Sequence, residues 1–192
     1  MVLMEAPVIM VGTDSVEVER RLSTGELVCR CGGRLVRWGH ARLRTVRGVG
    51  VLRPRRVRCA GCRVTHVLLS VACLWRRADG AEVIGAALRL KAAGAGHRPI
   101  ADRLDRPAST VRGWLRAFAR NAERVRSVFT SVLAQLDPLH GPSRSTGTSF
   151  AGAVEVVGVV AAAARRRLGV MGAVSPWQLA SAVTDGRLLA PG

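Results

Sequence analysis

This 192-residue sequence lacks tyrosine and has little lysine, and it also lacks several sequence patterns whose absence excludes classes of protein. Tyrosine is absent and lysine occurs once, so 29 arginines carry nearly all the positive charge. The run of small and apolar residues from 150 to 164 contains Glu155, and it is shorter than the roughly 20 apolar residues of a membrane span. The first ten residues lack the basic start and the cleavage site of a signal peptide. We therefore expect a cytoplasmic protein that does not cross a membrane.

Acidic residues are scarce in the middle of the chain. Residues 27–78 include no Asp or Glu but 13 arginines, and residues 29–126 hold 23 basic against five acidic side chains. The net charge of +17 is therefore concentrated there. Such a patch attracts polyanions, so nucleic acid is the leading partner and an anionic membrane surface the weaker alternative. Charge of this kind provides affinity without sequence preference.

Groups that could carry catalysis are also missing. A transposase of the ribonuclease-H type needs three carboxylates that converge on two metal ions. The acidic residues after position 121 are only Glu123, Asp137, Glu155 and Asp185, and the surrounding sequence has no sheet pattern. No glycine-rich phosphate loop or Ser/His/Asp grouping is present either. We expect a binding protein, not an enzyme, without a small-molecule substrate.

Two close cysteine pairs are the first positive feature, and they consist of Cys29, Cys31, Cys59 and Cys62. A hairpin between the pairs would bring them together as four thiolate ligands of a tetrahedral, structural Zn²⁺ site. The pattern predicts strands at 34–38, 43–46, 49–57 and 64–69, as in a zinc ribbon.

Alternatives to this zinc site remain open. Disulfides are disfavoured in a cytoplasmic chain, and a redox Cys-x-x-Cys would need a strand-to-helix setting. The first pair is Cys-x-Cys, so His40 or His66 could replace one thiolate. Cys73 lies in an apolar run and is expected in the core.

The segment 97–121 predicts the second and third helices of a helix-turn-helix. Asp79 is expected to cap a first helix, and a second helix over 98–104 stops before Pro107. Ser109 and Thr110 offer N-cap hydroxyls to a third helix over 109–121. Its apolar stripe would be Val111, Trp114, Leu115 and Phe118, opposite the three arginines Arg112, Arg116 and Arg120.

Five segments together carry a resemblance to a known family. They are Cys-Gly-Gly-Arg-Leu-x-x-Trp-Gly (31–39), Leu-Arg-Pro-Arg-Arg-x-Arg-Cys-x-x-Cys (52–62), Thr-His-Val-Leu-Leu (65–69), Arg-Arg-Ala-Asp (76–79) and 97–118. The chain resembles, over about residues 10–190, actinobacterial zinc-ribbon and helix-turn-helix proteins of unassigned function, similar to the N-terminal DNA-binding part of transposases. The resemblance implies DNA binding linked to transposition or its control. Family members usually have Cys-x-x-Cys at the first pair, so Cys29-Arg-Cys31 departs from the pattern.

These observations together predict a sequence-specific double-stranded DNA-binding protein of the nucleoid, active in transposition or transcription regulation. Arg112 and Arg116 are expected to contact base edges in the major groove, guanine above all. Phosphate contacts are expected from the ends of the third helix and from the ribbon, through Ser109, Thr110, Arg120, Arg53, Arg55 and Arg56. An RNA-binding zinc ribbon and an adaptor that recruits a separate transposase are the alternative functions.

The expected fold class is α+β, mostly α, in five segments. They are a strand and helix at 1–26, with Asp14 or Ser15 as cap, a zinc-ribbon-like β domain at 27–75, a helix-turn-helix domain at 78–136, a linker at 137–149 and C-terminal helices at 150–192. Apolar positions continue at helical spacing from Val125 to Leu136. This extension would be either a stalk for a homodimer or a helix packed within the chain. Ser175 and Pro176 predict the start of the last helix.

Overall fold

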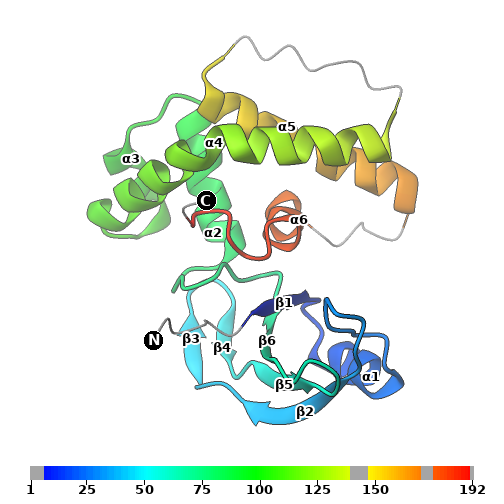
Figure 1. Cartoon of the computed structure of the whole chain (residues 1–192). Coiled ribbons are helices and arrows are strands. Elements are labelled where there is room, and N and C mark those ends of the chain that lie inside the picture. Colours follow the sequence, from blue (N-terminus) through cyan, green and yellow to red (C-terminus); the bar gives the residue numbers. More distant parts are fainter. Residues whose placement is uncertain (1–6, 139–146, 170–174, 191–192) are drawn as a thin grey trace.

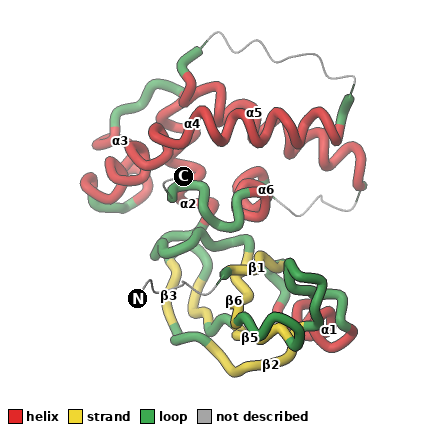
Figure 2. Tube along the Cα trace, viewed as in Figure 1, coloured by secondary structure: helices red, strands yellow, loops and turns green. Residues whose placement is uncertain are grey.

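The fold is α+β and has two stacked layers (Figure 1). The structure is a computed structural model that describes residues 7–138, 147–169 and 175–190. Six helices account for about 51% of these described residues, and six short strands form the rest of their regular structure. The strands and α1 form one layer, the sheet unit (residues 8–70), and the other helices form the helical unit (residues 81–190). Figure 2 shows the strands and α1 on one side and the other helices on the other. The linker expected at 137–149 lies mostly outside the described residues.

The sheet unit is built on a four-stranded sheet of order β1-β6-β5-β2, in which β1 runs parallel to β6 and the other pairs are antiparallel. Helix α1 covers one face with Val18 and Leu22, and the hairpin β3–β4 packs on the other face around Leu69. The elements are β1 (Val8–Val11), α1 (Ser15–Thr24), β2 (Leu35–His40), β3 (Arg44–Val46), β4 (Gly50–Leu52), β5 (Arg55–Cys59) and β6 (Thr65–Ser70).

The boundaries of these elements follow local chemistry. Asp14 caps α1 by accepting from the Val16 backbone N–H at 2.8 Å, as expected, and Gly25 ends the helix at φ 78°. The prediction of a single strand over 49–57 is wrong. It is divided into β4 and β5 at Arg53 and Pro54, because proline cannot donate a backbone hydrogen bond to a strand pair.

The helical unit is organised around α4, which runs unbroken for 29 residues. Helices α4 and α5 lie side by side and run parallel (Figure 1): Phe118 contacts Phe150 at one end, and Arg167 donates to the Leu136 carbonyl at the other. Val125 and Phe129 are buried in this interface, so the extension packs within the chain and is not a free stalk. The helices are α2 (Ala81–Ala92), α3 (His97–Leu104), α4 (Ala108–Leu136), α5 (Ser149–Leu168) and α6 (Pro176–Val183).

Helix α6 and the segment after it join the two units. Ser175 caps α6 as expected, and Trp177 packs on α2 at Gly85, where a Cβ atom would lie 2.1 Å from the indole. Ser181 donates to the Cys73 carbonyl at 2.6 Å, and the Trp75 N–H donates to the Gly186 carbonyl at 2.8 Å. These contacts fix the helical unit on the end of the sheet. None of the described helices is long and apolar enough to span a membrane.

Candidate metal centre and nucleic-acid interface

Four cysteines from two turns of the sheet unit form one cluster. Cys29 and Cys31 precede β2, whereas Cys59 ends β5 and Cys62 follows it. Their Sγ atoms all lie within 4.8 Å of one another, with 3.7 Å between Cys29 and Cys62 and 3.5 Å between Cys31 and Cys59. Four thiolates at about 2.3 Å from a tetrahedral Zn²⁺ would be separated by about 3.8 Å. The cluster could therefore hold a metal ion with little rearrangement.

The two cysteine turns share one backbone hydrogen-bond pattern but differ in length. The Cys29 N–H donates to the Gly33 carbonyl at 3.0 Å, and the Cys59 N–H donates to the Val64 carbonyl at 2.9 Å. Each turn then needs one residue in the left-handed region, which is Gly32 at φ 81° in the first and Arg63 at φ 64° in the second. The first turn is one residue shorter, and it still brings both of its sulfurs into the cluster. The Cys-x-Cys spacing therefore does not remove a ligand.

The sulfurs affect one another's ionisation strongly. A hydrogen bond from the Gly33 backbone lowers the pKa of Cys31 to about 6, and the neighbouring sulfurs act in the same direction. A backbone hydrogen bond from Val64 favours the Cys62 thiolate, but the nearby sulfurs raise the pKa of Cys62 to about 12. Four thiolates this close cannot all ionise unless a cation compensates their charge. The donor set thus fits a divalent metal ion.

Substitution of Gly33 tests this packing. A Cβ atom on Gly33 would lie 2.5 Å from Cys59 Sγ and 3.3 Å from Cys31 Sγ, so the sulfurs would have to move. We expect Gly33→Ala to weaken Zn²⁺ binding by about 10- to 100-fold, as for other changes next to metal ligands. The measurement is a competition titration against a chromophoric chelator. Gly12→Ala is the matched control, because nothing lies within 4 Å of its added Cβ atom, and equal affinities of the two variants would contradict the prediction.

Neither of the two histidines considered as ligands replaces a cysteine in the cluster. His66 is buried, and its Nε2 lies 3.3 Å from Cys29 Sγ, so it contacts a ligand and supplements the four cysteines. Burial lowers the pKa of His66, which favours the neutral ring that can donate an N–H to a thiolate. His40 lines a pocket at the opposite end of β5 from Cys59, next to Arg55. Cys73 is buried in the core, as expected.

The helices α2, α3 and α4 carry the second candidate site. A three-residue turn with Asp105 at φ 51° connects α3 to α4. The α4 side chains Val111, Trp114, Leu115 and Phe118 are buried in the core of the helical unit, as the apolar stripe predicts. On the opposite side, the three arginines Arg112, Arg116 and Arg120 are exposed. Within the part of the chain that the structure describes, no hydrogen bond or ion pair engages their guanidinium groups.

The helix caps predicted at Ser109 or Thr110 and at Asp79 are wrong. Helix α4 begins at Ala108 with Pro107 as its N-cap, because proline cannot donate a backbone N–H and its fixed φ suits a helix start. Ser109, which is exposed, and Thr110 therefore lie inside the first turn and cap nothing. Asp79 is not a cap either, since Gly80 takes that position.

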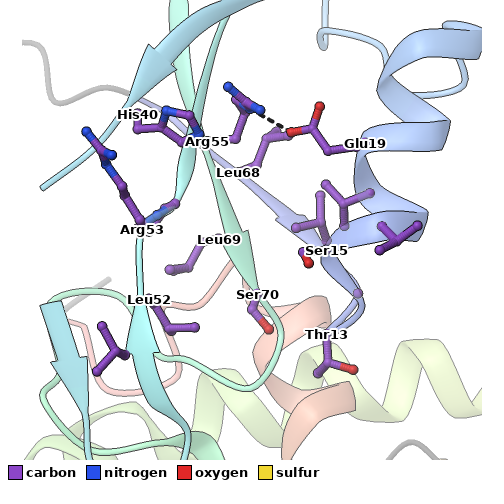
Figure 3. A pocket seen from close by; sticks show the side chains of 16 residues that line it. Thr13, Ser15, Glu19, His40, Leu52, Arg53, Arg55, Leu68, Leu69 and Ser70 are labelled. Carbon is purple, nitrogen blue, oxygen red and sulfur yellow. Dashed lines mark hydrogen bonds and ion pairs between the residues drawn. The ribbon is translucent and has the colours of Figure 1, made fainter. Parts of the chain in front are cut away.

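The ribbon arginines expected to contact phosphates do not form one patch. Arg53 and Arg55 line a cavity of about 670 Å³ between α1, β6 and the β4–β5 turn (Figure 3). Arg55 Nε donates to Glu19 Oε1 at 2.6 Å, so this guanidinium already has a carboxylate partner. Arg56 follows on the strand and is exposed on the opposite face of the sheet. The contact with Glu19 joins residues 36 positions apart, which no local pattern indicates.

Asp79 holds two parts of the fold together, whereas the sequence pattern assigned it to a helix cap. Its carboxylate is 3% exposed and accepts from Arg47, at the tip of the β3–β4 hairpin, and from Arg106, in the α3–α4 turn. This ion triad links the sheet unit to the turn before α4. The sequence contains one signal for these ion pairs: Asp79 is the first acidic residue after an arginine-rich stretch of 52 residues that has none.

No family model, curated protein or solved structure matches the chain. Two features of the molecule itself indicate what it could bind. One is the four-cysteine cluster, and the other is the exposed arginine face of α4.

Proposed function

We propose that this protein binds double-stranded DNA in a sequence-dependent way, with α4 as the recognition helix and a structural Zn²⁺ in the cysteine cluster. The observation that carries the proposal is the arginine face of α4. Arg112, Arg116 and Arg120 are spaced by four residues, exposed and without partners among the described residues, while the other side of the helix is buried. Free guanidinium groups on a rigidly packed helix suit bidentate contacts to guanine in the major groove.

Two further observations support the assignment. Helix α3 and the tight turn at Asp105 hold the first turns of α4 at the surface, an arrangement that supports the assignment of a helix-turn-helix. The middle of the chain carries a large excess of positive charge, which favours a polyanion. A structural role for the metal follows from the donor set, since four protein ligands leave no open position for a reacting water. A part in transposition or transcription control is proposed on the resemblance alone.

Selection from a random duplex pool by the zinc-loaded protein, with competitor DNA at physiological salt, tests the proposal. We expect a short enriched motif, and Arg112→Ala should lose discrimination at one position of that motif, at a cost of about 1–3 kcal/mol.

Arg165→Ala is the matched control for this substitution. Arg165 is also an exposed helical arginine, but it lies in the last turn of α5, at the far end of the α4–α5 pair. Its removal should leave the preferred motif unchanged. Enrichment of no motif, or equal effects of the two variants on every sequence, would refute recognition by α4.

A further inference from the structure

The outer face of strands β2 and β5 carries an exposed aromatic side chain. Val36 pairs with Arg58, and Leu35 pairs with Cys59. Alternate residues of a strand point to opposite faces, so Leu35 and Cys59 face the core under α1 while Val36 and Arg58 face outward. Trp38 also lies on the outer face, because the Arg58 guanidinium lies 4.7 Å from the centre of its ring. Val36 and Trp38 remain 40% and 52% exposed, respectively.

The ring of Trp38 is supported but not covered. Arg58 lies over the ring, and its Nε also donates to the Arg63 carbonyl at 3.1 Å, in the second cysteine turn. The guanidinium is therefore anchored on the turn between Cys59 and Val64 and contacts the indole by a cation–π interaction. Large exposed aromatic rings are costly in water, and stacking on a flat partner would remove this cost.

The positive charge around Trp38 indicates that the partner of this face is anionic. Arg56 is exposed on the same face as Arg58, and the segment 27–78 supplies no acidic side chain to neutralise them. Glu19 of α1 binds Arg37 and Arg55 on the opposite face of the sheet. The surface thus combines a flat aromatic ring with guanidinium groups and an excess of positive charge.

We propose that this face binds single-stranded nucleic acid, with one base stacked on Trp38 and the backbone phosphates close to Arg56 and Arg58. Aromatic rings among cationic side chains bind single strands through base stacking, whatever the sequence. A duplex fits this surface poorly, since its bases stack on one another and only its two terminal base pairs offer a free ring face. We call this surface, with Trp38, Arg56 and Arg58, the stacking platform. It is separate from the arginine face of α4, so single-strand binding there does not depend on recognition of duplex DNA by α4.

Titration of the zinc-loaded full chain with 12-nucleotide dT and rU oligomers, and with a blunt duplex of the same length, tests the proposal. Stacking should quench the fluorescence of Trp38, and the single strands should bind more tightly than the duplex to this site. Trp38→Leu should weaken single-strand binding by about tenfold, within the roughly 5- to 150-fold range that the loss of one stacking ring produces. Trp38→Phe should keep most of the affinity, because the ring remains. The dT and rU arms show whether DNA or RNA is preferred.

Two controls separate this proposal from the preceding one. Leu43→Ala removes another apolar side chain, 65% exposed, and should not change single-strand binding. Arg112→Ala should weaken duplex recognition and leave the quenching by dT intact. Equal losses for Trp38→Leu and Trp38→Phe, or full competition by the duplex, would overturn the platform whatever the outcome for α4.

Discussion

Removal of the metal ion is expected to unfold the sheet unit. Among the described residues, its core under α1 contains nine buried side chains, and Cys29 and Cys59 are two of them. Structural Zn²⁺ contributes an apparent free energy of about 10–16 kcal/mol in zinc-finger peptides near neutral pH, which exceeds the stability of a typical small domain. Without a cation, the four sulfurs within 4.8 Å cannot all be thiolates, and the turns that hold them lose their common partner.

The measurement is thermal unfolding, followed by circular dichroism, before and after treatment with a strong chelator. We expect one metal ion per chain in the untreated protein and a large fall in the unfolding temperature after chelation, restored by added Zn²⁺. Cys59→Ser should reproduce the effect of the chelator, because it removes a buried ligand. Cys73→Ala is the control: Cys73 is buried outside the cluster, so this variant should still bind one ion. An unfolding curve that chelation leaves unchanged would contradict a structural metal.

Features with a local cause could be predicted from the sequence. The cysteine pairs, the α1 cap at Asp14, the Ser175-Pro176 start of α6 and the buried stripe of α4 depend on residues within a few positions of one another. Close spacing of this kind restricts the possible backbone geometry. The candidate metal site was therefore predictable down to its four residues, even though the first pair has an unusual spacing.

Features that depend on contacts distant in sequence could not be predicted. Aspartate is a preferred N-cap residue, so the sequence assigns Asp79 to a helix cap. Only the fold brings Arg47 and Arg106 to it. Arg55 belongs to a basic cluster in the sequence, yet its partner Glu19 comes from α1. The choice between a stalk and an internal helix for residues 125–136 depended on whether α5 packs beside α4, because the apolar spacing is the same in both cases.

The ion triad at Asp79 is expected to contribute strongly to stability. The Asp79 carboxylate is 3% exposed and accepts from Arg47 at 2.9 Å through both oxygens and from Arg106 Nε at 2.6 Å. Asp79→Asn should lower the free energy of unfolding by about 3 kcal/mol, because the half-buried Arg106 loses its counter-charge and an amide N–H₂ faces guanidinium donors. Urea unfolding followed by tryptophan fluorescence measures this change.

A second ion pair provides the control for Asp79→Asn. Glu123 and Arg126 form a pair at 2.5 Å on α4, with 65% and 45% of their side chains exposed. Solvent screens an exposed pair of this kind, so Glu123→Gln should leave the unfolding curve unchanged. Equal shifts for the two variants would show that Asp79 acts only as an ordinary surface charge.

The pH dependence of stability tests the triad independently. Burial alone would raise the pKa of Asp79, but the hydrogen bonds and positive charges of Arg47 and Arg106 outweigh it and hold the pKa below its ordinary value of 3.8. A carboxylate with a depressed folded-state pKa stabilises the fold fully above the unfolded-state pKa and loses this contribution as the pH falls through the folded-state value. The difference in stability between the wild type and Asp79→Asn should therefore be constant near neutral pH and shrink below about pH 4. Both proteins share the four-cysteine cluster, so the effect of acid on that cluster largely cancels in this difference. A difference that does not change with pH would refute an ionised Asp79.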